Sequence, residues 1–145
     1  MKRLVMGLVA TISATVCASC SALPQVTFEY FNLSSNEVWV TDVIGLPPNA
    51  TPGRLMPSRD ESSLNAHSAT YFETVRIRPK IKILWKDGGA QGWPGGLKPN
   101  ELVPPGVTHE AEFKRDDLGI PAKLSSGKIR FTYLGSEKWH IRLDK

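Results

Sequence analysis

Thiols, long apolar runs and helical periodicity are all scarce in this chain of 145 residues. Its two cysteines, Cys17 and Cys20, would supply two of the four ligands that a structural zinc site takes, and no other cysteine exists. The longest uncharged apolar run, residues 4–16, is well short of the roughly 20 residues that span the hydrocarbon of a bilayer. No long window places apolar residues at the 3.6-residue period of a helix. These absences disfavour a zinc-stabilised fold and a helical bundle.

Catalytic motifs are scarce as well. The three histidines, His67, His109 and His140, are far apart, and "HEAE" at residues 109–112 lacks the second histidine of a zinc protease. The sequence "SSGK" at residues 125–128 matches the catalytic motif S-x-x-K. Its glycine disfavours the helix on which the serine of that motif lies. We therefore expect no enzymatic activity, no cofactor and no metal.

The chain opens with the layout of a secretory signal. Two basic residues, Lys2 and Arg3, precede the apolar run "LVMGLVATISATV", and small residues follow it. A positive start, a short apolar stretch and a small-residue cleavage point are typical of a segment that is removed on export. We therefore expect residues 1–19 to be a signal peptide rather than part of the fold.

The end of this segment, Cys17-Ala18-Ser19-Cys20, resembles the lipobox of bacterial lipoproteins. In that family, small residues at the two positions before an obligatory cysteine guide cleavage, and the cysteine becomes the acylated first residue. Ala18 and Ser19 fit this pattern, whereas Cys17 stands where leucine is most common. The alternative is ordinary signal-peptide cleavage after Ala18 or Ala22. A thioredoxin-like redox pair is disfavoured, because such a C-x-x-C follows a strand inside a βαβ unit.

The resemblance implies that Cys20 is the lipid anchor and that residues 20–25 tether the mature protein to a membrane. Several acyl chains are expected on such a residue, and more than one chain is what stable anchoring takes. In Gram-negative relatives an aspartate after the cysteine favours the inner membrane. Ser21 stands there instead, which implies the outer membrane, on its periplasmic side. In a Gram-positive host the same anchor would face outward from the single membrane.

Charge is distributed unevenly along the chain. The whole sequence has 18 basic and 14 acidic residues, and its net charge of +4 is too mild to indicate a nucleic-acid partner. Residues 26–75 carry six acidic and two basic side chains, whereas residues 76–145 carry 14 basic and eight acidic ones. We therefore expect one part of the fold to be markedly more positive than the rest.

Apolar residues alternate with polar ones in several short segments, which predicts half-buried strands. The clearest is "TVRIRPKIKILWK" at residues 74–86, where Pro79 indicates either an edge strand or two short strands meeting at a bend. "KIRFTYL" and "KWHIRLD" flank a "GSE" connection that suits a hairpin. The residues predicted to face the core are Val26, Phe28, Tyr30, Val38, Val40, Val75, Ile77, Ile81, Ile83, Trp85, Ile129, Phe131, Tyr133, Trp139, Ile141 and Leu143.

About seven such strands cannot bury their apolar faces in one open sheet. We therefore predict an all-β fold over residues 26–145, a single domain of two antiparallel sheets packed as an immunoglobulin-like or transthyretin-like sandwich. The alternative is a small closed β-barrel. Long connections rich in proline and glycine lie at residues 45–66 and 87–108, and loops of this length commonly bind something or are disordered.

Two features are candidates for a binding surface. The first is the polar face of the 74–86 segment, with Arg76, Arg78, Lys80 and Lys82, which suits an anionic ligand or simply solvates an outer face. The second is Trp93 in "GGAQGWPGGLKP", which is either an exposed anchor for a partner or a plug over one end of the sandwich.

These features predict a membrane-anchored binding module rather than a catalyst. We expect the partner to be another envelope protein, with the chain acting as a secretion-apparatus subunit, an inhibitor or an immunity factor. The alternative is an anionic envelope ligand, such as lipopolysaccharide or a cell-wall glycan, bound through the basic face. These assignments rest on fold-level analogy and location rather than on a diagnostic motif.

Overall fold

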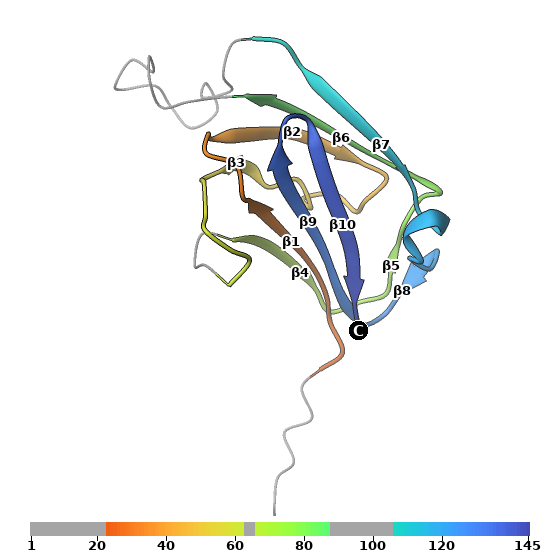
Figure 1. Ribbon diagram of the computed structural model, residues 1–145. Helices are drawn as coiled ribbons and strands as arrows, with labels where there is room; N and C mark the ends of the chain where they lie inside the picture. Colours follow the sequence, from red (N-terminus) through yellow and green to blue (C-terminus); the bar gives the residue numbers. More distant parts are fainter. Residues whose placement is uncertain (1–22, 63–65, 88–105) are drawn as a thin grey trace, which may run out of the picture.

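The structure is a computed structural model that describes residues 23–62, 66–87 and 106–145. Its strands form two four-stranded sheets (Figure 1). The sheet that we call the β1 sheet has the order β10-β9-β1-β4. Its strands are β1 (Val26–Asn32), β4 (His67–Tyr71), β9 (Gly127–Gly135) and β10 (Lys138–Asp144).

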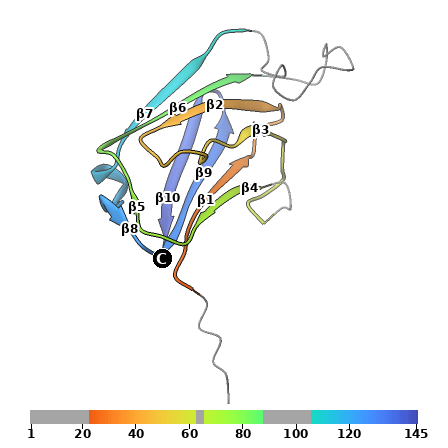
Figure 2. The same cartoon turned by 180° about the vertical axis from the view of Figure 1, so that it is seen from behind.

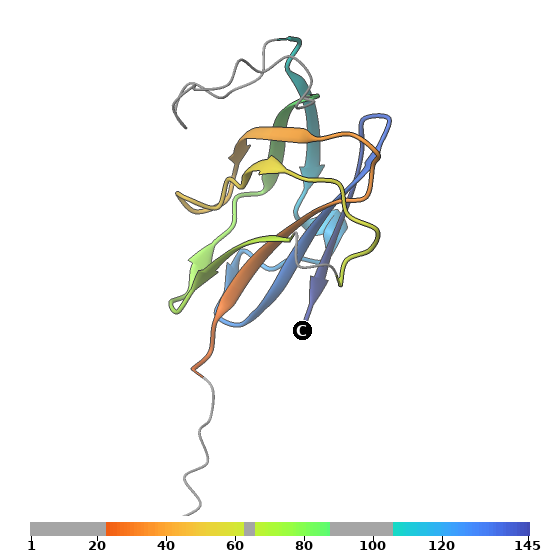
Figure 3. The same ribbon diagram turned by 90° about the vertical axis from the view of Figure 1, so that its left-hand side faces the viewer.

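The second sheet, the β2 sheet, has the order β3-β2-β6-β7. Its strands are β2 (Val38–Ile44), β3 (Gly53–Leu55), β6 (Lys80–Asp87) and β7 (His109–Lys114). A small ladder joins β5 (Val75–Arg76) to β8 (Lys123–Leu124), and η2 (Asp116–Leu118) is a single 3-10 turn. Views from behind and from the side show the two large sheets packed against each other (Figures 2 and 3).

The predicted alternation determines which face of each strand is buried. Val26, Phe28 and Tyr30 of β1 are fully buried, as are Ile81, Ile83 and Trp85 of β6. All the residues predicted to face the core belong to one buried cluster, with Leu143 packed against it from a partly buried position. The apolar face of each sheet therefore covers that of the other, which is the physical reason for the sandwich.

Pro79 separates two strands rather than lying within one. Val75 and Arg76 pair with β8, whereas β6 begins at Lys80 and pairs with β2 and β7. Proline has no N–H to donate to a ladder, so the chain bends here and passes from the small ladder into the β2 sheet. The second of the two predicted alternatives, two short strands meeting at a bend, is confirmed.

The predicted all-β sandwich is confirmed, with one pairing that alternation alone does not predict. Six of the seven strand ladders among the described residues are antiparallel, but β1 and β9 run parallel from Val26↔Gly127 to Asn32↔Tyr133. Both large sheets stay open, with β10 and β4 or β3 and β7 at their edges. The described strands therefore do not form the closed barrel considered as the alternative.

The strand register gives the β1 sheet two distinct ends. At the end that we call the N-terminal end, the start of β1 lies beside the end of β4 (Val26↔Tyr71), and the start of β9 lies beside the end of β10 (Lys128↔Asp144). Leu23, the first described residue, and the C-terminus also lie there (Figure 1). The opposite end, the hairpin end, has the β9–β10 turn and the loop between β1 and β2.

Candidate functional site

A groove opens at the hairpin end of the sandwich. It lies between the β1–β2 loop and the β9–β10 hairpin and has a volume of about 610 Å³. That volume is within the range of binding sites in proteins. Its polar lining consists of hydroxyl, amide and carboxylate side chains, namely Ser34, Ser35, Asn36, Asp87, Tyr133, Ser136 and Glu137.

The wall formed by the β1–β2 loop is held by one buried amide. Asn32, at the end of β1, is 1% exposed. Its Nδ2 donates to the carbonyl oxygens of Asn36 (2.7 Å) and Leu55 (3.1 Å). Its Oδ1 accepts from the backbone N–H and the hydroxyl of Ser34, at 3.0 and 2.6 Å. Because every hydrogen bond of this amide is fixed by a neighbour, the loop has a defined shape before any partner binds.

The opposite wall is the tight turn of the predicted hairpin. Gly135, Ser136 and Glu137 all have positive φ, at 87°, 49° and 61°. Two successive residues of this kind form the primed turns that match the twist of paired strands. The backbone N–H of Glu137 donates to Tyr133 Oη at 3.3 Å. The predicted "GSE" hairpin is confirmed, and it places Ser136 and Glu137 at the mouth of the groove.

An aromatic cluster supports the groove from below. Tyr133 and Trp139 have ring centroids 5.1 Å apart, and Trp85 packs edge-on against Trp139 at 5.7 Å. His109 stacks on Trp85, with 5.6 Å between centroids and 22° between the ring planes. Burial raises the pKa of Tyr133, so its hydroxyl remains a neutral hydrogen-bonding group at physiological pH. The cluster gives the groove a rigid apolar base.

His109 joins the two sheets beside the groove. Its Nδ1 lies 2.8 Å from Glu137 Oε1 in the hairpin, and its Nε2 lies 3.3 Å from Asp87 Oδ2 at the end of β6. Both nitrogens of an imidazole can donate only when the ring is protonated, so this geometry suits an ion pair with two carboxylates. Among the described residues, no three His, Cys, Asp or Glu side chains are placed to share a metal ion.

The predicted basic residues of the 74–86 segment divide into two kinds. Lys80 Nζ lies 2.8 Å from Glu112, and Lys82 Nζ lies 3.7 Å from Glu110, so both lysines are paired across β6 and β7. Arg76 and Arg78 are exposed, and neither forms an ion pair with a described carboxylate. The four side chains therefore do not present a uniform row of free charge.

The basic residues of β9 and β10 lie on the outer face of the other sheet. Lys128 and Arg130 both contact Glu29, at 2.7 and 3.0 Å. Arg142 contacts Glu61 at 2.6 Å and Asp144 at 3.1 Å. These strands belong to the β1 sheet and β6 belongs to the β2 sheet. The two sets of cations are therefore not joined into one positive sheet surface.

Two of the predicted site residues, Cys20 and Trp93, lie outside the described residues, as does the predicted signal peptide. The described chain has no helix with the length and apolar composition needed to cross a membrane.

The groove itself was not predicted from the sequence. The polar loop "NLSSN" at residues 32–36 and the "GSE" turn are both visible as connections. Alternation does not tell which connections meet at one end of a sheet, because that depends on the parallel pairing of β1 with β9. The contacts of His109 with Asp87 of β6 and with Glu137 of the hairpin turn likewise join segments that are distant in the sequence.

Comparisons with known proteins identify no relative of this chain. A scan of protein-family models, a search of curated proteins and a search of solved structures each gave no match. The function proposed below is therefore based on the sequence and the geometry of this chain.

Proposed function

We propose that this chain is a lipoprotein of the bacterial envelope, cleaved before Cys20 and acylated there, whose sandwich is a non-catalytic binding module for another envelope protein. The observation that carries the proposal is the arrangement of the two ends of the β1 sheet. The chain enters β1 at one end, next to Leu23, and the groove lies at the other. A domain anchored through residues 20–25 would present this groove away from its membrane.

The distance between the two ends supports this arrangement. β1 runs from the N-terminal end to the hairpin end in seven residues, which corresponds to about 20 Å of strand. The groove is thus separated from the membrane by the height of the sandwich and is accessible to a second protein. The absence of Asp at position 21, where Ser21 stands, favours the periplasmic side of the outer membrane as the location.

The chemistry of the groove indicates what kind of surface would fit. The side chains of Asp87 and Glu137 are 58% and 65% exposed, so their carboxylates are available at its rim. Ser35 and Asn36 are exposed on the facing wall. Carboxylates, hydroxyls and amides above an aromatic base suit a protein loop with basic or amide side chains. Because a carboxylate lies at each ring nitrogen of His109, that residue suits a structural role better than proton transfer.

The alternative partner is an anionic ligand bound through Arg76, Arg78, Lys80 and Lys82. Lys80 and Lys82 already have carboxylate partners across the sheet. A ligand would have to displace these carboxylates or bind beside them. Two of the four basic residues therefore add little free charge to this face, whereas the groove is enclosed by a loop with fixed hydrogen bonds and a tight turn, which favours the protein partner.

Site-specific photocrosslinking in the native envelope tests the proposal. A photoreactive amino acid is introduced at Ser35, in the groove, and as a matched control at Ser68, which is exposed on β4 of the same sheet. We expect a discrete adduct with one envelope protein from position 35 and none from position 68. Adding Asn36→Arg on the groove wall should lower the yield at position 35 about tenfold, because a bulky cation would occupy the space of the partner.

Two results would contradict the groove as the binding site. One is the same adduct from positions 35 and 68, and the other is an adduct from position 35 that Asn36→Arg leaves unchanged. Mass spectrometry of the same preparation reports the acylation of Cys20 independently. The anchor and the binding site are therefore tested separately.

A further inference from the structure

The N-terminal end of the sandwich exposes apolar side chains beside the start of the chain. Leu23 is 72% exposed and Phe72 is 69% exposed. Phe72 follows Tyr71, which pairs with Val26 at the start of β1, so the phenyl group lies at the same end of the sheet as Leu23. A phenyl group this exposed adds little to the core. Together with Leu23, it leaves two apolar side chains at this end available for contact outside the chain.

Basic residues lie at the same end. Arg76 of β5 is directly opposite Lys123 of β8 in the small ladder, and both side chains are exposed. Like charges directly opposite each other destabilise a strand pair. Neither of them, nor Lys145 at the C-terminus, forms an ion pair with a carboxylate that the structure describes. An anion bound between them would relieve this repulsion.

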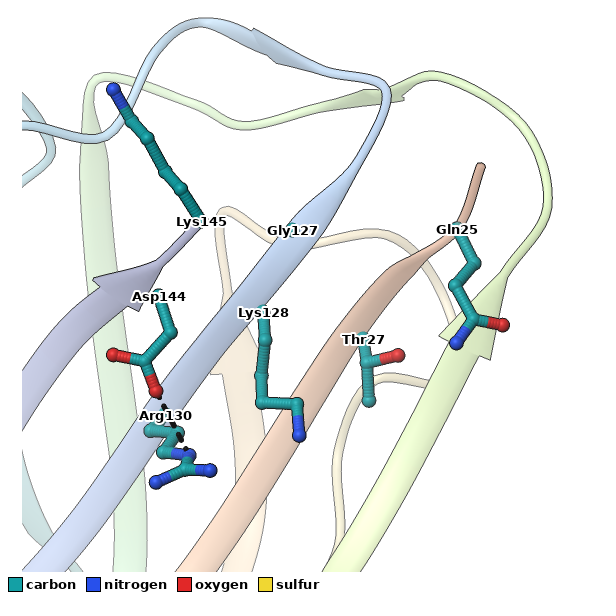
Figure 4. A pocket seen from close by; sticks show the side chains of 7 residues that line it. All are labelled: Gln25, Thr27, Gly127, Lys128, Arg130, Asp144 and Lys145. Carbon is teal, nitrogen blue, oxygen red and sulfur yellow. Dashed lines mark ion pairs between the residues drawn. The ribbon is translucent and has the colours of Figure 1, made fainter. Parts of the chain in front are cut away.

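A hollow of about 390 Å³ opens next to Lys145, between the start of β1 and the C-terminus. Gln25, Lys128 and Lys145 line it (Figure 4). Its carboxylate, Asp144, already pairs with Arg130 at 3.1 Å, and the side chain of Lys145 points away from that pair (Figure 4). Glu73, exposed next to Phe72, is the acidic residue nearest to the phenyl group in the chain.

We propose that the N-terminal end is a membrane-contact surface for anionic phospholipid, with Phe72 and Leu23 entering the headgroup region and Arg76, Lys123 and Lys145 binding lipid phosphates. The inference rests on the proposed function, because acylated Cys20 would bring this end to the bilayer. Gln25 lies five positions after Cys20, and five steps of a fully extended chain span at most about 18 Å. The domain would thus stay close to the bilayer, and its N-terminal end would contact the lipid headgroups.

The combination of side chains suits a lipid surface better than a soluble anion. Apolar groups gain free energy in the headgroup region, whereas cations near an anionic surface are attracted to it within about one Debye length. The acyl anchor alone would place the N-terminal end nearest the bilayer but would let the sandwich tilt on its tether. Contact of this end with the headgroups would narrow the tilt and so keep the groove facing away from the bilayer.

Spin labelling of the acylated full-length protein tests the inference. In the proposed mature protein, Cys17 has left with the signal and the Cys20 thiol is alkylated, so a single engineered cysteine is the one reactive thiol. Ser126→Cys reports the N-terminal end, since Ser126 is exposed there, and Ser35→Cys reports the hairpin end. Both are labelled with a nitroxide and reconstituted in phosphatidylcholine vesicles with or without phosphatidylglycerol.

We expect the label at position 126 to be accessible to oxygen and protected from a water-soluble nickel complex when phosphatidylglycerol is present. The label at position 35 should remain in water on both kinds of vesicle.

Substitutions at the N-terminal end should weaken this contact. Arg76→Glu combined with Lys123→Glu should lower the ratio of membrane-bound to free orientations of the domain at least about 25-fold, because each cation contributes about fivefold near an anionic surface. Phe72→Ser should reduce oxygen accessibility at position 126. Lys138→Glu, a matched reversal at the start of β10 at the hairpin end, should change neither label.

The outcomes separate the inference from the proposed function. A protein that is acylated at Cys20 but keeps the label at position 126 in water on both vesicles overturns the membrane-contact surface and leaves the anchor standing. Equal contact with and without phosphatidylglycerol overturns the role of the cations. A preparation with no acyl group on Cys20 contradicts the proposed function itself, which mass spectrometry shows before any label is added.

Discussion

Glu61 shows how one side chain can join distant parts of this sandwich. It belongs to the connection between β3 and β4, yet its carboxylate reaches the outer face of the β1 sheet. It accepts a hydrogen bond from Thr132 at 2.6 Å and contacts Arg142 at 2.6 Å and Arg130 at 3.4 Å. Burial by itself would raise the pKa of Glu61, but the hydrogen bond from Thr132 and the charges of Arg142 and Arg130 outweigh it. The pKa of Glu61 therefore lies below its usual value.

Replacing Glu61 with Gln should destabilise the fold in a pH-dependent way. A lowered pKa in the folded state gives stability that is present above the unfolded pKa of about 4.3 and is lost as the pH falls through the folded value. We expect Glu61→Gln to lower the free energy of unfolding by about 1–2 kcal/mol near neutral pH. The difference from the unmodified protein should close in acid below about pH 4. Urea unfolding measured over a pH series checks both statements.

Glu110→Gln is the matched control. Glu110 is 65% exposed and lies 3.7 Å from Lys82, and exposed ion pairs of this kind contribute little to stability. Its substitution should leave the free energy of unfolding nearly unchanged at every pH. A loss of stability in Glu61→Gln that is the same at low and neutral pH would show that the carboxylate charge is not what matters.

Residue-scale predictions from the sequence succeed where the signal is local. Burial of Phe28, Ile83 and Phe131 follows from alternation. The ion pairs of Arg130 and Arg142 with Glu61 join residues about 70 and 80 positions apart, and no pattern in the chain indicates such contacts. For this reason the basic residues could be predicted to face outward, but not which of them are neutralised.

At the scale of strands, the chain depends on a close approach between the residue that follows β2 and the start of β6. Gly45 follows β2 directly, with φ of 102°, and its carbonyl accepts the backbone N–H of Arg78 at 3.0 Å. A Cβ atom built on Gly45 would overlap the backbone carbonyl oxygen of Lys80. Only glycine has both the conformational freedom and the space for this position.

Gly45→Ala should therefore destabilise the protein far more than Gly53→Ala. Gly53 also has positive φ, at 75°, but nothing lies within 4 Å of its missing Cβ. The control should lose about 1–2 kcal/mol from backbone conformation alone. Gly45→Ala should lose about 2 kcal/mol more, because β6 must shift to admit the methyl group. Chemical unfolding of the two variants measures the difference, and equal losses would contradict the close approach.

The strands themselves could largely be predicted, because period-two alternation is a local signal. At Pro79, however, alternation does not tell an edge strand from a bend between two strands. The sequence placed a bend or an edge there, and the structure shows the bend with β5 and β6 in different ladders. Likewise, the shift in register between Val40 and Asp42 in β2 accompanies a break in the alternation, because Asp42 is exposed and Val43 is buried, but such a break does not tell how the neighbouring strand pairs. Pairing partners and bulges depend on the whole sheet rather than on the segment.

At the scale of the whole molecule, the two ends of the β1 sheet differ in chemistry. The hairpin end has an acidic, hydroxyl-rich groove on an aromatic base, and the N-terminal end has exposed Phe72 among basic residues. Five basic residues of the C-terminal half, Lys80, Lys82, Lys128, Arg130 and Arg142, pair with carboxylates on the sheets, and two of those carboxylates, Glu29 and Glu61, come from the N-terminal half. Charge counted along the chain therefore did not predict where free charge lies in space.

The acylation of Cys20 is tested most directly by the mass of the N-terminal peptide of the protein purified from its own host membrane. A lipoprotein anchored at the end opposite its groove should begin at Cys20, with the mass of a diacylglyceryl group, further acylated or not, on that residue. The matched Cys20→Ser variant should lose this modification and leave the membrane fraction. A mature chain that begins at any other residue, or at an unmodified Cys20, would contradict the anchor on which the orientation of the groove depends.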